Sequence, residues 1–229
     1  MTPWMDGALL GVLTLAGFLI GQGLRHNLGL LGYRIILARH DERSHPYPGA
    51  RRWVPVSLAG AWLLLGVAFS GPDWPWLLLW LPFASGGVWL AAVDFDVHRL
   101  PDRIQLPLGA YSLVVGAGLA VAGLGSWRSG LIAALACALV FWGINLISRD
   151  AVGFGDVKLV FICGWCLGLL DWVAVLVGLA LSCMLALAYA SIRHSRRFAF
   201  GPWLIAGSVL SACAFGLSWG GEIVISLTR

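Results

Sequence analysis

Eight apolar segments, separated by short stretches with proline, glycine or charge, constrain the fold of this chain more than any other feature. An α-helix needs about 20 apolar residues to cross the hydrocarbon core of a bilayer, and most of the segments reach that length. The sequence therefore predicts an all-α, polytopic membrane protein with about eight transmembrane helices. We place the helix ends to within about 2–4 residues. The predicted spans lie near residues 6–24, 54–71, 74–93, 104–124, 129–148, 157–170, 172–192 and 202–227.

The composition leaves room for little besides these helices. Of the 229 residues, 59% are hydrophobic and 11% are charged, whereas a soluble domain is about half apolar and about a quarter charged. We therefore expect residues 1–229 to form a single integral membrane domain. The segment from Asp6 to Gln22 lacks the basic start of a signal peptide, so we interpret it as the first spanning helix.

Basic residues are concentrated in alternate connections between the predicted helices. Cytoplasmic loops carry an excess of Lys and Arg, so this bias places the odd-numbered loops in the cytoplasm and both termini in the periplasm. Only Arg128 and Arg229 fall on the other side. The remaining thirteen of the 15 are Arg25, Arg34, Arg39, Arg43, Arg51, Arg52, Arg99, Arg103, Arg149, Lys158, Arg193, Arg196 and Arg197.

The only sizeable loop is the first one, at about residues 25–53. It is short for a functional insertion, contains no cysteine, and includes the irregular stretch from Ser44 to Gly49. Its arginines either serve the membrane topology alone or also contact anionic lipid headgroups or a partner. Membrane lipid is in any case an expected partner of the chain.

A glycine-flanked carboxylate marks the start of the sixth helix, in the sequence Gly153-Phe154-Gly155-Asp156-Val157-Lys158. The glycines permit backbone angles that are closed to other residues and let a neighbouring segment approach closely. Asp156 falls where the helix dipole and free amides favour a carboxylate. Taken alone, this motif indicates a helix cap more than a catalyst. The sixth helix is also short, which suggests that it starts within the membrane boundary.

A second acidic stretch, DFDVHRLPD, runs from Asp94 to Asp102. Asp94 ends the third predicted helix, and an ionisable residue at that position is a candidate for chemistry because it is costly to keep in a membrane. Pro101 stops the fourth helix from extending backwards, and Asp102 is placed to cap it. Asp96 and His98 are expected in the short turn, in solvated or hydrogen-bonding roles.

Asp94 and Asp156 lie on the same predicted face of the membrane and can therefore form a pair. Two carboxylates side by side share a proton, because like charges in contact do not both ionise easily. One would activate a water as general base, and the other would polarise a scissile carbonyl and protonate the leaving amine. No Ser/His/Asp order, HExxH motif or P-loop indicates a competing chemistry.

Two other interpretations of the aspartates remain at this point. In a small transporter or channel they would relay protons or bind a cation, although such carboxylates usually lie near the bilayer midplane. In a scaffold of a secretion machine they would only cap helices.

Together and in this order, the two acidic stretches resemble the type IV prepilin leader peptidases, bacterial inner-membrane aspartic proteases of the GxGD type. The span count, the topology and the sequence Phe200-Gly201-Pro202-Trp203 before the last helix are also similar. The resemblance implies removal of the leader of type IV prepilins or type II secretion pseudopilins at the cytoplasmic face. It also implies catalytic roles for two residues and supporting roles for the rest of the motifs: Asp94 and Asp156 are the catalytic pair, and Gly153, Gly155, Lys158, Pro101 and Asp102 support them.

The first loop departs from the family pattern. Many members carry paired cysteines there, in what looks like a zinc-bound insertion, and use S-adenosylmethionine to methylate the new N-terminal amine. Because residues 25–53 contain no cysteine, we expect no zinc, and the sequence leaves N-methylation and its cofactor open. Proteolysis by two aspartates needs no cofactor, and we expect no nucleic-acid partner.

The five cysteines all fall inside predicted spans, where disulfides and zinc sites are not expected. They are Cys137, Cys163, Cys166, Cys183 and Cys213. We therefore predict that the Cys163-Gly164-Trp165-Cys166 segment contributes to packing.

Overall fold

The chain is described by a computed structural model over residues 3–37, 49–147, 153–193 and 199–227. Within these ranges it forms nine α-helices and one 3₁₀ turn, η2 (Gly71–Asp73), and no β-strand, which confirms the all-α prediction. The helices are α1 (Pro3–Gly29), α2 (Gly32–Leu37), α3 (Trp53–Ala68), α4 (Trp76–Val97), α5 (Asp102–Val121), α6 (Trp127–Ile147), α7 (Phe154–Leu170), α8 (Trp172–Arg193) and α9 (Gly201–Leu227).

Each of the eight predicted spans corresponds to one long helix. Among the described residues, six helices are long and apolar enough to cross a membrane, namely α1, α4, α5, α6, α8 and α9. The other two are shorter, with 16 residues in α3 and 17 in α7. At 1.5 Å per residue they extend about 24–26 Å, slightly less than a hydrocarbon core of about 30 Å. The expectation of a polytopic protein with a short sixth span is therefore confirmed.

The first loop contains more helix than the sequence suggested. Helix α1 continues to Gly29, and after a turn at Leu31 the chain forms the six-residue helix α2. A helix this short has no long apolar run, so the hydropathy of the sequence does not reveal it. Residues 38–48, including Arg39, Arg43 and most of the Ser44–Gly49 stretch, lie outside the described residues.

Helix α7 begins three residues before the predicted start at 157. Two glycines weaken helix propensity at this point, but a hydrogen bond from the backbone of Gly153 to the side chain of Asp156 stabilises the first turn. As a result, Lys158 lies within α7 and not in the preceding loop. Arg149, Arg196 and Arg197, which were also assigned to loops, lie outside the described residues.

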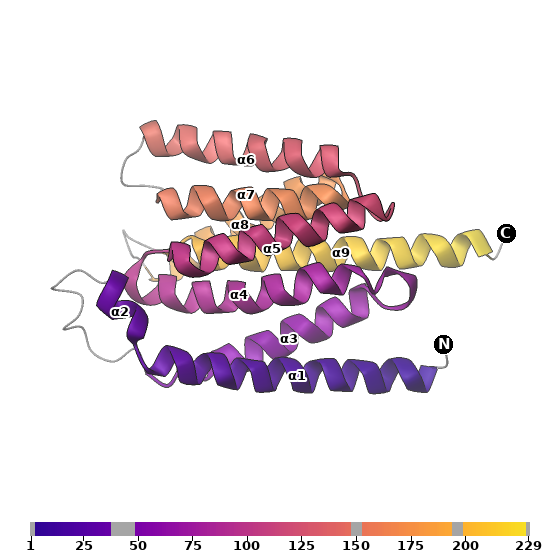
Figure 1. Ribbon diagram of the computed structural model, residues 1–229, viewed down its shortest axis with the longest axis horizontal. Coiled ribbons are helices and arrows are strands. Elements are labelled where there is room, and N and C mark those ends of the chain that lie inside the picture. The colour runs from indigo at the N-terminus through magenta and orange to yellow at the C-terminus, as the bar shows by residue number, and fades with distance from the viewer. Residues whose placement is uncertain (1–2, 38–48, 148–152, 194–198, 228–229) are drawn as a thin grey trace.

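The two acidic stretches lie at the same end of the helix bundle (Figure 1). This end, called the α2 end below, also contains α2, the connection between α4 and α5, and the start of α7. Both described termini lie at the opposite end. The arrangement agrees with the predicted order of crossings, while the assignment of the α2 end to the cytoplasm stays a prediction.

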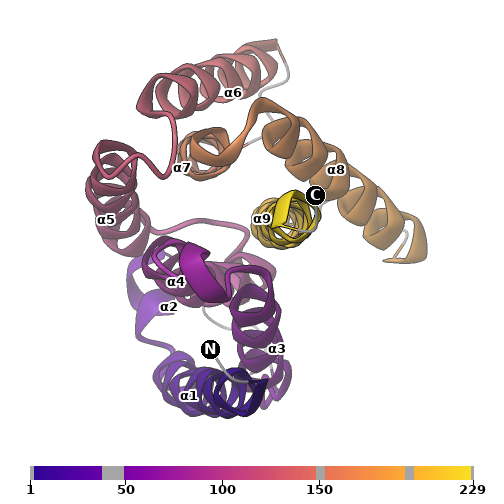
Figure 2. The ribbon, with the colours of Figure 1, turned by 90° about the vertical axis from the view of Figure 1, so that its right-hand side faces the viewer.

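The two helices that carry the candidate aspartates are largely enclosed by their neighbours. In α7, every residue from Leu159 to Leu170 except Phe161 is buried, and in α4 the residues Leu90–Asp94 are all buried. Viewed along the bundle, α9 lies between α4 on one side and α7 and α8 on the other (Figure 2). The candidate site is thus built on helices held on several sides by neighbouring helices.

Small residues allow α6 and α7 to pack closely. A Cβ atom added to Gly164 would lie 3.0 Å from the Ala133 carbonyl oxygen, and one added to Gly168 would lie 3.0 Å from the Gly130 Cα. Helices in membranes commonly associate through such small-residue contacts, because backbones can then approach each other. Helix α7 is therefore held in place by α6 along its length.

The cysteines are free thiols, as expected for packing residues. Cys163 and Cys166 are buried within α7, and Cys137 and Cys213 are buried on α6 and α9. Cys183 on α8 is exposed on the surface of the chain.

Candidate active site

Asp94 lies in the last turn of α4 and is only 5% exposed. Helix α4 ends three residues later because His98 adopts a left-handed conformation, with φ 50°, and donates its N–H to the Asp94 carbonyl. The Asp94 carboxylate oxygen Oδ2 accepts a hydrogen bond from the N–H of Gly201, with 3.1 Å between N and O. Because Gly201 is the first residue of α9, the positive end of that helix dipole favours the carboxylate.

The absence of a side chain at Gly201 leaves room for this contact. A Cβ atom at this position would lie 2.9 Å from Oδ2 of Asp94 and 3.3 Å from Cδ2 of Leu100. The sequence drew attention to Phe200-Gly201-Pro202-Trp203 only as the start of the last helix. Its role as a hydrogen-bond donor to Asp94 was missed, since the two residues are 107 positions apart.

Asp156 lies in the first turn of α7, two residues after the helix begins at Phe154. Its Oδ2 atom accepts the backbone N–H of Gly153 at 3.2 Å, so the predicted capping role is confirmed. The other carboxylate oxygen, Oδ1, is buried and has no hydrogen-bond partner among the described residues. A buried polar atom without a partner is costly, so this oxygen is suited to bind water or substrate.

Leu100 connects the two carboxylates in space. A Cβ atom on Gly155 would lie 3.0 Å from the Leu100 Cβ, and Leu100 also contacts Gly201 as described above. Asp156 directly follows Gly155, while Asp94 binds Gly201, so Leu100 lies between the segments that carry the two carboxyl groups. The two carboxyl groups also interact electrostatically. The structure therefore brings Asp94 and Asp156 together at the α2 end of the bundle.

Gln105 is a residue of this site that the sequence analysis missed. It lies in the first turn of α5, is fully buried, and donates its Nε2 hydrogen to the Gly155 carbonyl at 2.7 Å. This bond joins α5 to the glycine motif before Asp156. A glutamine in the first turn of an apolar helix is a signal that could have indicated such a role.

The expectation that Asp102 caps α5 is wrong. Pro101 occupies the N-cap position, and no side chain caps this helix. Asp102 is instead the first helical residue, and its Oδ1 atom forms an ion pair with Nζ of Lys158 at 2.6 Å. The side chains of Lys158 and Asp102 are 30% and 54% exposed, so the pair is accessible to water and links α5 to α7. The role of Pro101 in ending the connection is confirmed.

The placement of Asp96 in a solvated turn is also wrong. Asp96 lies in the last turn of α4, and its side chain is only 7% exposed. Its oxygens bind Arg34 and Tyr33 of α2, so the hydrogen-bonding alternative is the correct one. His98 follows α4 as its exposed C-cap.

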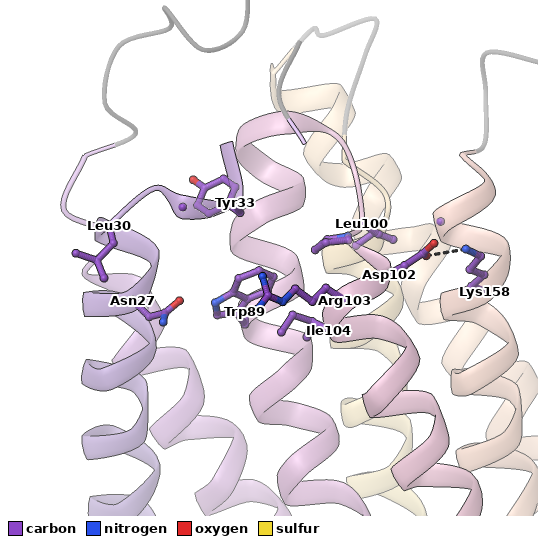
Figure 3. A pocket seen from close by; sticks show the side chains of 12 residues that line it. Asn27, Leu30, Tyr33, Trp89, Leu100, Asp102, Arg103, Ile104 and Lys158 are labelled. Atoms are coloured by element: carbon purple, nitrogen blue, oxygen red, sulfur yellow. Dashed lines mark hydrogen bonds and ion pairs between the residues drawn. The ribbon is translucent and has the colours of Figure 1, made fainter. Parts of the chain in front are cut away.

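A pocket of about 800 Å³ opens beside Asp156 at the α2 end (Figure 3). The end of α1 and α2 form one wall, α4 contributes Trp89, and the start of α5 forms the other wall together with α7. The lining is largely apolar and carries the Asp102–Lys158 ion pair at one side. The residues are Asn27, Leu30, Gly32, Tyr33, Trp89, Leu100, Pro101, Asp102, Arg103, Ile104, Gly155 and Lys158.

The described residues contain no group of three or more His, Cys, Asp or Glu side chains that could hold a metal ion. Asp94 and Asp156 together offer the chemistry of two neighbouring carboxyl groups. One can be ionised and one protonated at the same time, which supplies a base and an acid at one place.

The sequence matches the model of the type IV leader peptidase family over residues 81–191, a range that contains both Asp94 and Asp156. A prepilin leader peptidase/N-methyltransferase of Aeromonas hydrophila is 31% identical over 195 residues, which cover 77% of this chain and 61% of that protein. A protein of the same name from Dickeya chrysanthemi is 31% identical over 193 residues, covering 79% of this chain and 65% of the relative.

A third protein of that name, from Escherichia coli (strain K12), is 30% identical over 131 residues, or 53% of this chain and 56% of the relative. The matches thus span less than two thirds of the length of these curated relatives. No solved structure matches the chain. The family match, the relatives and the two acidic motifs within the matched range agree with one another, and all are similarities to the type IV leader peptidase family.

Proposed function

We propose that this chain is a membrane aspartic endopeptidase that removes the leader peptide of type IV prepilins or type II secretion pseudopilins. Asp94 and Asp156 form its catalytic pair. The observation that supports this most directly is that the segments carrying Asp94 and Asp156 meet at Leu100, inside the range that matches the family. The names of the relatives supply the class of substrate.

The two aspartates divide the reaction between them. The ionised carboxylate removes a proton from a water molecule as it attacks the scissile carbonyl, and the protonated one donates a hydrogen bond to the carbonyl oxygen and then a proton to the leaving amine. The unpartnered Oδ1 atom of Asp156 suits the binding of that water. The bond from Gly201 and the start of α9 favour an ionised Asp94, while Gly153 and the start of α7 favour an ionised Asp156, so the structure supports either aspartate as the base.

The pocket beside Asp156 provides room for the peptide on one side of the scissile bond. Gly155 and Lys158, which flank Asp156, are part of its lining, and so is Leu100, which touches both halves of the site. An extended peptide in this pocket would pass close to both carboxyl groups. The apolar lining and the ion pair suit a segment in which polar and hydrophobic residues meet.

The location we propose is the bacterial inner membrane, with the α2 end in the cytoplasm. The excess of Lys and Arg in the loops at that end supports this orientation. In this orientation the leader is removed on the cytoplasmic side, and both termini face the periplasm.

A transporter is a poorer explanation of the same aspartates. Asp94 lies in the last turn of α4 and Asp156 in the first turn of α7, both at the α2 end. Carboxylates that carry protons or cations across a membrane usually lie near its midplane. Their position at the helix ends favours chemistry on a substrate at the membrane surface.

N-methylation of the new N-terminus is a second candidate activity, because the relatives are named as methyltransferases as well as peptidases. The pocket residues do not fit S-adenosylmethionine well. The one acidic side chain in the pocket lining, Asp102, is already paired with Lys158 and is not free to bind the ribose or amino group of such a cofactor. We therefore assign no residue to methyl transfer.

The proposal is tested by replacing each aspartate with its neutral isostere. Asp94→Asn or Asp156→Asn should abolish leader removal from a co-expressed type IV prepilin, because each change removes half of the acid/base pair. A gel shift of the prepilin measures cleavage, and the mass of its N-terminus reports both the cleavage position and any methyl group.

Asp171→Asn is the matched control. It removes a carboxylate from the opposite end of the bundle, where Asp171 accepts the N–H of Val173 at 2.7 Å. It should leave cleavage intact. Full processing by either of the first two variants would contradict the proposed catalytic pair.

A further inference from the structure

Four residues at the α2 end form a buried, charged cluster that the proposed reaction does not use directly. They are Tyr33, Arg34, Arg51 and Asp96, called the Asp96 cluster below. Arg34 binds Asp96 with both arms of its guanidinium group, from Nε to Oδ2 at 2.7 Å and from the terminal nitrogen to Oδ1 at 2.5 Å. The two side chains are 8% and 7% exposed. Such a two-pronged contact fixes orientation as well as distance.

Tyr33 and Arg51 complete the cluster through contacts with Asp96 and with each other. The Tyr33 hydroxyl donates to Oδ2 of Asp96 at 2.5 Å and accepts a hydrogen bond from the guanidinium group of Arg51. Arg51 also lies 3.4 Å from Oδ2 of Asp96 and donates to the Leu28 carbonyl at 3.4 Å. Burial and the hydrogen bond to Asp96 raise the pKa of Tyr33, which keeps its hydroxyl protonated as the donor. The Arg51 guanidinium group stacks 5.4 Å from the centre of the Tyr33 ring.

The backbone is strained at three points around this cluster. Leu31, Arg51 and His98 have φ angles of 53°, 41° and 50°, and no other non-glycine residue in the described ranges has a positive φ. Left-handed conformations are uncommon for such residues and persist where the surrounding structure holds them. Leu31 precedes the segment with Tyr33 and Arg34, and His98 follows the turn with Asp96. Each strained residue therefore lies in or next to a segment that supplies the cluster.

The Asp96 cluster also forms part of the pocket wall. Tyr33 lines the pocket, and its ring lies edge-on against Trp89 with 6.2 Å between ring centres. Figure 3 shows Tyr33 above Trp89, with Asn27 and Leu30 on the same side and Arg103 and Ile104 opposite. Asp96 is also two residues from Asp94, so one turn of α4 carries both the candidate catalyst and the support of the pocket wall.

We propose that Asp96 is a positioning residue for substrate binding, which holds Tyr33, Arg34 and Arg51 so that α2 forms the wall of the pocket beside the catalytic pair. This role rests on the proposed peptidase function. In this role Asp96 does not contact the scissile bond. Asp96 acts through Tyr33 and α2. Its loss should weaken binding of the leader region more than it slows the chemical step.

A purely stabilising role accounts less well for the cluster. A buried ion pair contributes little net stability compared with apolar packing of the same volume, because removing two charges from water is costly. The cluster instead joins three separate segments, at Tyr33–Arg34, Arg51 and Asp96, in one defined geometry. Such geometry is useful where a surface must be held in register with a reacting group.

The test compares KM and kcat for leader removal by the full-length protein in detergent, with a purified type IV prepilin as the probe. Asp96→Asn should raise KM by about tenfold and change kcat by less than about twofold, because binding is weakened before chemistry begins. Tyr33→Phe removes the hydroxyl but keeps the ring against Trp89, and should raise KM by a smaller factor. Arg34→Ala should raise KM. Arg34→Lys keeps the positive charge but cannot make the two-pronged contact, so its KM should lie between the values of Arg34→Ala and the unaltered protein.

Arg52→Ala is the matched control for Arg51→Ala, since Arg52 is the exposed neighbour with the same charge. It should have the KM of the unaltered protein, whereas Arg51→Ala should raise it. If Asp96→Asn fails to fold, Tyr33→Phe, which removes a single oxygen atom, decides the question. An unchanged KM in Tyr33→Phe and Arg51→Ala, or a loss of kcat at constant KM, would overturn the positioning role.

The two proposals fail in different ways. If the unaltered protein does not cleave the prepilin at all, the proposed function is wrong. If it cleaves and the cluster variants bind the prepilin as the unaltered protein does, only the role of Asp96 is wrong.

Discussion

At the scale of single residues, Gly201 shows how a missing side chain shapes the candidate site. Its N–H reaches Asp94 because no Cβ stands in the way, and the same space admits Leu100. Leu100 in turn contacts Gly155, next to Asp156. Two glycines therefore let one leucine fill the space between the segments that carry the two carboxyl groups.

Gly201→Ala should strongly reduce activity while leaving the fold largely intact. The added methyl group would lie 2.9 Å from Oδ2 of Asp94, so the carboxylate must move. A displacement of about 1 Å at a reacting group can lower the rate by about 100-fold. The measurement is the initial rate of leader removal by protein that migrates as a single species in detergent.

The control for this substitution is Gly118→Ala on α5, where an added Cβ has no atom within 4 Å. This variant should keep the rate of the unaltered protein. Equal rates for Gly201→Ala and Gly118→Ala would show that the contact between Gly201 and Asp94 does not matter for catalysis.

The sequence revealed the candidate catalysts but not the residues that hold them. Asp94 and Asp156 were visible because a carboxylate next to an apolar helix is unusual. Gln105 and Gly201 were missed because their hydrogen bonds join positions 50 and 107 residues apart, which no local pattern indicates. Asp96 was misplaced for the same reason, since its partner Arg34 lies 62 residues away.

At the scale of elements, α7 depends on its close contact with α6. Gly168 is the tightest point of this contact, because an added Cβ would lie 2.6 Å from the Ala133 Cβ and 3.0 Å from the Ser129 carbonyl oxygen. Neither Ala133 nor the backbone of Ser129 can rotate away. Helix α7 carries Asp156 in its first turn, so its position relative to α6 also affects the site.

Gly168→Ala should therefore destabilise the protein by about 1–3 kcal/mol, as overpacking does in a filled interior. Thermal unfolding in detergent, followed by circular dichroism, measures the effect. Gly143→Ala on α6 is the matched change, because an added Cβ there contacts no atom within 4 Å and alanine favours helix. A fall in Tm of the same size in both variants would argue against the tight contact at Gly168.

The long helices could be predicted from the sequence and the short ones could not. An apolar run of about 20 residues has few alternatives to a spanning helix, so each of the eight segments was found. Helix α2 has six residues, and it is held by the contacts of Tyr33 and Arg34 with α4 more than by its own apolar pattern. The early start of α7 likewise depends on one side-chain contact, from Gly153 to Asp156.

At the scale of the whole molecule, the two ends of the bundle carry different features. The candidate aspartates, the pocket and the Asp96 cluster all lie at the α2 end, whereas the described termini lie at the other end (Figure 1). The sequence predicted this separation from the distribution of basic residues. It could not predict the pocket, since the lining comes from α1, α2, α4, α5 and α7, several of which are far apart in the sequence.

Labelling of introduced cysteines should report the proposed orientation. In a Cys183→Ser background, which removes the exposed native thiol, Ser70→Cys between α3 and α4 should react with a membrane-impermeant maleimide in intact cells. Arg52→Cys at the α2 end should react only after the inner membrane is opened. The opposite pattern would place the candidate site on the periplasmic side and contradict the proposed location.

The hydrogen bond between Asp94 and Gly201 has a consequence for biosynthesis. A ribosome releases the chain from the N-terminus onwards, so α4 and α7 enter the membrane before α9 is made. A nascent chain at that stage already carries both aspartates but lacks the amide that orients Asp94. If Asp94 and Asp156 are the catalytic pair, as proposed, leader removal is expected to begin only after α9 has inserted.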